Sequence, residues 1–356
     1  MKRNDQSTSY LWPFATMVFL FFVVGFLTTA NMQFQTPLKE AFLSGAGRLK
    51  NSLTLLITFS WFVAYPIFGW IGGKWVSSKG YQHTMTRGLA LMTIGVSLFV
   101  LSAASTGWNL SANSPLPIGY FIFLLGSFLT GGAATVLQVV INPYLVACDI
   151  PHTQAVQRMA IGGSSNAIGT VIAPYFVAAI AFNNVSIQDV NIGQVLTPYA
   201  VLAIVILATT LLFSRFHLPD MASTHANEEE RLNASVWSFK RFRLGVVAIF
   251  CYVGCEVCVG GNINLYVVQD LKGSVSDVAG MATAYWALML LGRLMGSALR
   301  TVSPRVQLSI ATTAATTLIV LGITLQEPWL LVAVGFFHSI MWGCIYTLAI
   351  SGLGKY

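Results

Sequence analysis

Ten apolar runs, each long enough to cross a lipid bilayer, constrain this 356-residue chain more than any other feature. A spanning helix needs about 20 apolar residues, whereas the strands of a membrane barrel read as short alternating segments. Only 9% of the residues are charged, too few to cover a soluble protein of this size. The sequence therefore predicts an all-α membrane protein. The runs cover residues 11–36, 51–73, 84–106, 116–147, 154–183, 195–216, 242–268, 277–301, 305–325 and 328–352.

The basic residues predict which side of the membrane each loop faces. If Lys2 and Arg3 are cytoplasmic, 15 of the 19 Lys and Arg residues fall on the cytoplasmic side. The positive-inside rule then predicts a cytoplasmic N-terminus for a multi-pass protein of the plasma membrane, which we expect to be a bacterial inner membrane. The net charge of +7 is read as a topology signal rather than as a sign of nucleic-acid binding.

A polar stretch at 217–241 divides the chain. It separates a predicted N-terminal bundle of six helices, residues 1–216, from a predicted partial C-terminal bundle of four, residues 242–356. Six spans, a cytoplasmic linker and a second helical group are typical of transporters built from two similar halves. We therefore expect about ten of twelve spans here, with the chain truncated after Tyr356.

Glu256 is the strongest functional signal, because it stands alone among apolar residues in the segment 248–261. A charged side chain at the centre of a bilayer costs about 2.5–3.5 kcal/mol or more, so such residues usually mark a path for ions or substrates. The position of Glu256 indicates a carrier.

Polar residues recur in every third run as pairs spaced i, i+4, and each pair lies on one helix face. This recurrence predicts that four helices line a central cavity, whose amide, carboxyl, imidazole and aromatic groups suit a polyhydroxylated solute. The alternative is hydrogen bonding between helices, worth about 0.6 kcal/mol on average in membranes. The pairs are Asn31 with Gln35, Gln138 with Asn142, Tyr252 with Glu256, and His338 with Trp342.

Three further polar residues have more than one interpretation. Asn262 follows two glycines, so it either breaks the seventh helix and faces a cavity or marks the far membrane interface. We expect Lys74 and Arg293, at cytoplasmic helix ends, to make gating contacts or to reach toward the headgroups rather than to bind substrate.

Neither a metal, a cofactor nor an enzymatic activity is predicted. The five histidines show no metal-ligand spacing with acids, and no catalytic constellation is present. Three cysteines at 251, 255 and 258 lie within an apolar helix, where we interpret them as packing residues.

Several motifs lie along the chain. They are Phe21-Phe22-Val23-Val24-Gly25-Phe26 through Asn31, Gln138-Val139-Val140-Ile141-Asn142-Pro143, Arg158 with Ser165-Asn166-Ala167-Ile168-Gly169, Phe250-Cys251-Tyr252-Val253-Gly254-Cys255-Glu256, Gly292-Arg293, and Ile350-Ser351-Gly352-Leu353-Gly354-Lys355-Tyr356. These motifs resemble those of the fucose/galactose/glucose–proton symporter group of the major facilitator superfamily. The resemblance covers essentially the whole chain and implies twelve spans and alternating access around a sugar site near the bilayer midplane. Asn166 joins the expected substrate-binding residues.

The departures from that group affect proton coupling. Met32 and Gln138 stand where the resemblance implies two acids associated with coupling, Gly163 stands in place of a glutamine, and His338 in place of an asparagine. Glu256 is then the acid expected to carry proton coupling.

The sequence thus favours a secondary active transporter that imports a monosaccharide such as fucose, glucose or galactose by proton symport, acting as a monomer. One alternative on the same scaffold is a drug or metabolite exporter. The other is a sugar carrier without proton coupling, either a uniporter or a carrier driven by another ion. A membrane enzyme or receptor is a third, less favoured class.

Overall fold

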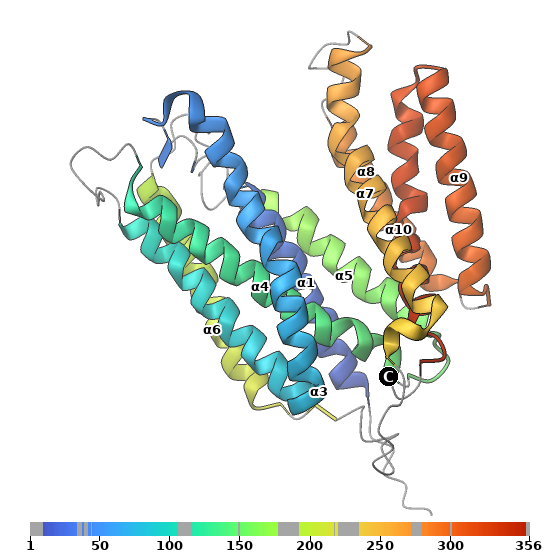
Figure 1. Ribbon diagram of the computed structural model, residues 1–356, viewed down its shortest axis with the longest axis horizontal. Helices are drawn as coiled ribbons and strands as arrows, with labels where there is room; N and C mark the ends of the chain where they lie inside the picture. Colours follow the sequence, from blue (N-terminus) through green and yellow to red (C-terminus); the bar gives the residue numbers. More distant parts are fainter. Residues whose placement is uncertain are drawn as a thin grey trace, which may run out of the picture. The chain divides into compact units, whose positions relative to one another are not determined.

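The structure is a computed structural model that describes residues 10–33, 38, 42–43, 45–105, 116–148, 150–176, 192–216, 218–219, 235–271, 280–299 and 301–353. Its regular elements within these ranges are helices (Figure 1). They are α1 (Leu11–Gln33), the short η1 (Gly47–Leu49), α3 (Lys50–Ala104), α4 (Ile118–Ala147), α5 (Ala155–Phe176), α6 (Ile192–Ser214), the short η4 (Val236–Ser238), α7 (Lys240–Gln269), α8 (Met281–Ala298), α9 (Pro304–Thr324) and α10 (Pro328–Ile350).

Each predicted apolar run contains a helix, so the all-α membrane architecture is confirmed. Seven helical segments of the described chain are long and apolar enough to cross a membrane. One of them is α3, whose 55 residues would extend about 80 Å at 1.5 Å each, far beyond a bilayer core of about 30 Å. The backbone of α3 leaves the helical region at Gly80, with φ 76° and ψ 177°, so α3 holds two predicted spans joined by a turn.

Local sequence explains several helix ends. Ser303 caps α9 by accepting a hydrogen bond from the Val306 amide, and Pro304 follows at the first helical position, where the missing N–H is not needed. Pro328 likewise lies at the start of α10, although Glu327 before it makes no side-chain cap bond. The Ser77 and Ser78 hydroxyls donate to the Lys74 carbonyl oxygen within α3, outside the predicted span.

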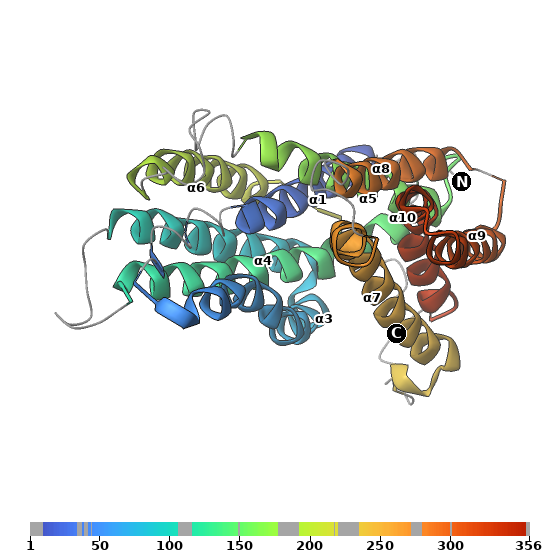
Figure 2. The same ribbon diagram turned by 90° about the horizontal axis from the view of Figure 1, so that it is seen from above.

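The chain forms two compact units, one of residues 19–144 and 168–222, the other of residues 1–18, 145–167 and 223–356. In the first unit α6 lies along α3 (Figure 2). Phe99 of α3 stacks on Phe123 of α4, and Tyr199 of α6 packs at a tilt against both rings. In the second, α10 packs against α7, α8 and α9. The predicted boundary at 217–241 stays a prediction, and residues 217 and 220–234 lie outside the described part of the chain.

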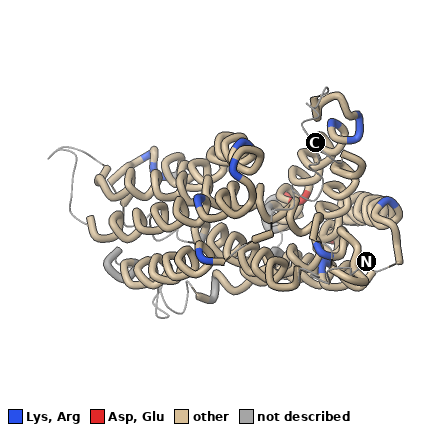
Figure 3. Tube along the Cα trace, turned by 90° about the horizontal axis from the view of Figure 1, so that it is seen from below, with Lys and Arg blue, Asp and Glu red and all other residues tan. Residues whose placement is uncertain are grey.

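Charge is sparse along the described helices (Figure 3). Among the described residues the acids are Glu256, Asp270 and Glu327. Asp270 caps the C-terminal end of α7, and Glu327 precedes α10. Glu256 is therefore the acid within the membrane helices of the described chain.

Candidate functional site

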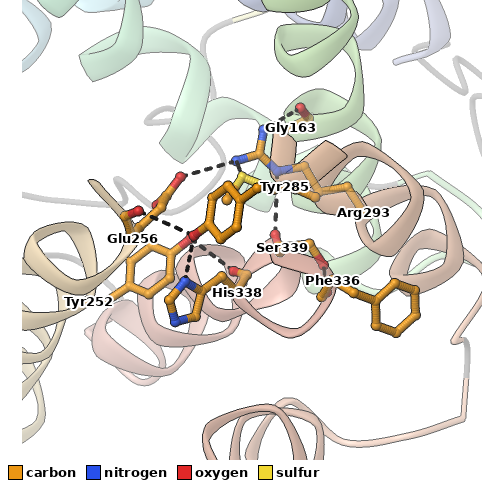
Figure 4. A network of polar contacts seen from close by, with 9 residues as sticks. Gly163, Tyr252, Glu256, Tyr285, Arg293, Phe336, His338 and Ser339 are labelled. Atoms are coloured by element: carbon orange, nitrogen blue, oxygen red, sulfur yellow. Dashed lines mark hydrogen bonds and ion pairs between the residues drawn. The ribbon is translucent and has the colours of Figure 1, made fainter. Parts of the chain in front are cut away.

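Polar side chains from three helices of one unit converge around Glu256 (Figure 4). Tyr252 and Glu256 lie one turn apart on α7, Tyr285 and Arg293 come from α8, and His338 comes from α10. The side chains of Glu256 and Arg293 are 14% and 16% exposed, so both charges lie largely within the helix packing. We call these five residues the Glu256 cluster.

Arg293 is the most connected member of the cluster. Its Nη2 atom lies 4.0 Å from Oε1 of Glu256, which makes an ion pair. Its Nη1 donates to the Gly163 carbonyl oxygen of α5 at 2.9 Å, and its Nε donates to the Ser339 carbonyl oxygen at 3.4 Å. One guanidinium thus connects α7, α5 and α10, which suits its planar fork of five N–H donors.

Tyr285 and His338 form the neutral part of the cluster. The Tyr285 hydroxyl lies 2.8 Å from Nδ1 of His338 and donates to the Glu256 carbonyl oxygen at 3.2 Å. Both contacts are satisfied together if His338 carries its proton on Nδ1. The Tyr252 hydroxyl donates to the His338 carbonyl oxygen at 2.9 Å. Tyr252 thus links α7 to α10 directly, and Tyr285 links α8 to both of them.

Glycines make room for the Tyr285 ring. A Cβ atom on Gly260 would lie 2.6 Å from a ring carbon of Tyr285, and one on Gly335 would overlap the Tyr285 carbonyl oxygen. A Cβ on Gly292 would overlap the Ser339 hydroxyl. Small residues allow membrane helices to approach closely, and here they fix the position of the cluster.

The predicted polar residues of the other unit make contacts between helices. Oδ1 of Asn31 accepts a hydrogen bond from Ser127 at 2.7 Å, and Nε2 of Gln138 donates to the Tyr65 hydroxyl at 3.3 Å. Within the described chain, Nδ2 of Asn31 and Oδ1 of Asn142 are buried without a hydrogen-bond partner. An unsatisfied buried polar group costs about 1–3 kcal/mol, so both atoms retain capacity for a ligand or a water.

The other predicted site residues are dispersed. Helix α7 continues through Gly260 and Gly261, so it does not break before Asn262, which is exposed and donates to the Cys258 carbonyl oxygen at 2.8 Å. Trp342 stacks on Tyr346, with ring centroids 5.1 Å apart. The Lys74 ammonium lies 3.6 Å above the Trp70 ring.

Two of the predicted residues need separate comment. Asn166 is half-buried on α5. Gln35 lies outside the described residues, so its predicted role has no structural counterpart here. Each of the predicted substrate contacts stays a prediction, although His338 is only 2% exposed and its Nδ1 is already occupied by Tyr285.

Sequence reasoning missed Tyr285 and the partner of Glu256. Arg293 is 37 residues beyond Glu256, so nothing in the local sequence connects the two. A weaker signal was available, because Tyr285, Met289 and Arg293 recur every fourth residue and share one face of α8. Nη2 of Arg293 also contacts the sulfur of Met289 at 3.4 Å.

In the described ranges, no group of three or more His, Cys, Asp or Glu side chains is arranged to hold a metal ion. The five cysteines are free; Cys148 and Cys344 are buried, and the three on α7 are exposed.

Comparison with known proteins identifies relatives over nearly the full chain. The sequence model of one protein family, the Major Facilitator Superfamily, matches residues 17–356 of this chain. The chain is 29% identical over 364 residues to the glucose/galactose transporter of Brucella abortus biovar 1 (strain 9-941), covering 99% of this chain and 84% of that protein. It is 24% identical over 386 residues to the L-fucose-proton symporter of Escherichia coli (strain K12), covering 99% and 83%.

Solved structures agree on the fold. The crystal structure of the transporter FucP in the outward conformation superposes with a TM-score of 0.78 at 21% identity, over 98% of this chain and 86% of that one. The proton:xylose symporter XylE, bound to 6-bromo-6-deoxy-D-glucose, gives a TM-score of 0.64 at 14% identity, over 98% and 84%.

Proposed function

Because the chain belongs to the Major Facilitator Superfamily, a family of membrane transporters rather than enzymes, we propose that it imports a monosaccharide by proton symport. The names of its relatives, a glucose/galactose transporter and an L-fucose-proton symporter, support this substrate class and this coupling ion. In this proposal the protein works as a monomer in a bacterial inner membrane, with its N-terminus in the cytoplasm.

The observation that carries the proposal is the Glu256 cluster. A carboxylate and a guanidinium are held 4.0 Å apart among membrane helices, beside two tyrosines and a histidine. Ionisable residues inside a membrane are costly and mark transport paths. The pair has no net charge, which suits an uncharged, polyhydroxylated solute, and the carboxylate can bind the proton.

The unpartnered atoms of Asn31 and Asn142 support a sugar as the solute. The first is an amide N–H donor and the second an amide oxygen acceptor, so each can bond a hydroxyl group. Asn31 bonds Ser127 of α4, and Asn142 lies 15 residues or about 22 Å further along that helix, so the two atoms lie at different levels. A drug exporter would need few such groups. We propose Asn31, Asn142 and Gln138 as sugar contacts from α1 and α4, and Glu256 as the coupling acid.

The test is uptake of labelled fucose, glucose and galactose into proteoliposomes, with internal and external pH recorded together. Wild-type protein should accumulate one sugar under an inward proton gradient and alkalinise the outside on sugar addition. Glu256→Gln should abolish the alkalinisation but retain sugar exchange. Glu327→Gln, the same chemical change outside the membrane helices, is the matched control and should behave as wild type.

Three outcomes contradict the proposal in different ways. Sugar uptake without alkalinisation in the wild type identifies a uniporter or another coupling ion. Alkalinisation that persists in Glu256→Gln assigns the proton to another group. Thermal stabilisation by amphiphilic drugs, with none by sugars, favours the exporter.

A further inference from the structure

We infer that Tyr65 sets the orientation of the Gln138 side-chain amide, so that Gln138 offers its oxygen, and not its N–H groups, to a sugar hydroxyl. The inference rests on the proposed function, in which Gln138 is a sugar contact. Tyr65 is then a positioning residue that acts on the sugar through Gln138. The position on the sugar that meets Gln138 must carry a hydrogen-bond donor.

The first observation is the contact between α3 and α4 at Gln138. Nε2 of Gln138 on α4 donates to the Tyr65 hydroxyl oxygen of α3 at 3.3 Å. The two helices are held close together here, because a Cβ atom on Gly131 of α4 would overlap the Trp61 carbonyl of α3. Tyr65 lies one turn beyond Trp61 on α3, so the helix contact fixes where Tyr65 stands relative to α4.

The second observation is a threonine on α1 that can only accept a hydrogen bond from Tyr65. The Thr28 hydroxyl donates to the Val24 carbonyl oxygen at 2.7 Å. The Tyr65 hydroxyl lies within hydrogen-bonding range of Thr28. A hydroxyl has one hydrogen, and that of Thr28 is already used, so Thr28 must accept from Tyr65.

These contacts fix the direction of each hydrogen bond that follows. The one hydrogen of the Tyr65 hydroxyl is directed to Thr28, so the Tyr65 oxygen can only accept from Gln138. The orientation of a side-chain amide is assigned from such a network, because its oxygen and nitrogen are alike in shape. In the reversed orientation, Oε1 of Gln138 would face the Tyr65 oxygen with no hydrogen between them. We call the series of Val24, Thr28, Tyr65 and Gln138 the Tyr65 chain.

An indole nitrogen beside the Tyr65 chain favours the same direction. Nε1 of Trp61 lies near the Tyr65 hydroxyl, although it is buried without a hydrogen bond of regular geometry in the described chain. An indole N–H can only donate, so a Tyr65 oxygen that accepts suits this neighbour and a Tyr65 hydrogen directed at it would not.

The amide oxygen of Gln138 is accessible to a solute. Gln138, Tyr65 and Thr28 are each half-buried, whereas most residues around Gln138 on α4 are buried. With Nε2 bonded to Tyr65, Oε1 is the end of the amide that lies away from α3. An amide oxygen accepts from a hydroxyl but gains nothing from fluorine, which cannot donate. Replacement of one sugar hydroxyl by fluorine therefore tests which end of the amide meets the sugar.

The experiment compares each sugar with its fluorinated analogues. Exchange of labelled fucose, glucose or galactose is measured in proteoliposomes, in competition with analogues that carry fluorine in place of one hydroxyl at a time. In the wild type, fluorine at one ring position should raise the competitor concentration needed for half-inhibition about tenfold, as expected for one lost hydrogen bond. We call this increase the fluorine penalty.

Variants of the Tyr65 chain should remove the fluorine penalty at that position. Thr28→Val frees the Tyr65 hydrogen, so the amide can turn and offer its N–H groups, from which fluorine can accept; the penalty should fall to about twofold or less. Tyr65→Phe should have the same effect, because the amide loses its anchor. Thr28→Ser keeps the hydroxyl and should keep the wild-type penalty. Thr16→Val is the matched control on α1, since Thr16 also donates to the carbonyl four residues before it, and it should behave as wild type.

A double-variant cycle tests the Tyr65 chain without any sugar. In steric trapping in bicelles, Tyr65→Phe should lower the ratio of folded to unfolded protein about tenfold. Thr28→Val should cost less when added to Tyr65→Phe than when added to the wild type, because the bond between the two side chains is then already absent.

Two results would overturn the inference. In a wild type that exchanges sugar, fluorine penalties that Thr28→Val and Tyr65→Phe both leave unchanged show that Tyr65 does not orient the group that meets the sugar. An equal cost of Thr28→Val with and without the Tyr65 hydroxyl shows that these two side chains do not bond. If the wild type exchanges no sugar, the proposed function fails, while the cycle still decides whether the Tyr65 chain exists.

Discussion

Replacement of Glu256 by glutamine removes one charge of an ion pair that lies largely within the helix packing. At 4.0 Å and an effective dielectric constant of about 20, the attraction between the two charges is about 4 kcal/mol. The loss of stability should be smaller than this attraction, because the Arg293 guanidinium still donates to the Ser339 carbonyl oxygen. We expect Glu256→Gln to lower the free energy of unfolding by about 2–3 kcal/mol, since it leaves a cation without its partner.

The double variant Glu256→Gln/Arg293→Gln removes both charges, so no isolated cation remains. It should therefore lie within about 1 kcal/mol of the wild type and be more stable than either single variant. Unfolding is followed by steric trapping in lipid bicelles at pH 8. Lys74→Gln is the exposed control, for which loss of the contact with Trp70 should cost about 0.5–1 kcal/mol. If the double variant is as unstable as the sum of the two single variants, the pair contributes no coupling and the electrostatic argument fails.

Three further predictions use other contacts. Tyr285→Phe removes the hydroxyl shared by His338 and the Glu256 carbonyl; it should cost about 1–2 kcal/mol in the same unfolding assay, and a cost near zero would contradict the bond geometry. Gly131→Ala should abolish monodisperse protein on size exclusion, because a Cβ there overlaps the Trp61 carbonyl, whereas a Cβ at Gly73 meets no atom within 4 Å, so Gly73→Ala should leave the elution unchanged. Burial raises the pKa of the Cys148 thiol to about 12, so the reactive thiolate forms only as the pH approaches that value; maleimide labelling at pH 8 should be slow until the protein is denatured, and rapid labelling of native protein would refute this placement.

The positions of the helices could be predicted from the sequence to within a few residues. The run at 328–352 corresponds to Pro328–Ile350, and the run at 305–325 to Pro304–Thr324. This works because a bilayer imposes one length and one polarity on every span. The turn inside α3 was harder to predict from the sequence. The two runs are separated by ten residues, most of them polar, yet the chain stays helical there except at Gly80.

The contacts among the site residues could only partly be predicted. The i, i+4 rule correctly placed Tyr252 beside Glu256 on one face of α7, and that face meets His338. It could not reveal Arg293, because the approach of α8 to α7 depends on packing around Tyr285 and on glycines at 260 and 335. The sequence also does not show whether a polar side chain within a membrane helix contacts a solute or another helix. His338 bonds to Tyr285, and Asn31 bonds to Ser127.

The glycines between α3 and α4 bear on how this part of the protein can move. A Cβ on Gly95 would overlap the Thr130 hydroxyl, one on Gly126 would come within 2.9 Å of the Phe99 ring, and one on Gly131 would overlap the Trp61 carbonyl. The two helices thus touch along several turns with almost no side chain between their backbones. Because the helices are in such close contact, neither can slide or rotate past the other without a steric clash. Any rearrangement during a working cycle must carry this pair as a solid block, and the bending must occur in parts of the chain that are less tightly interlocked.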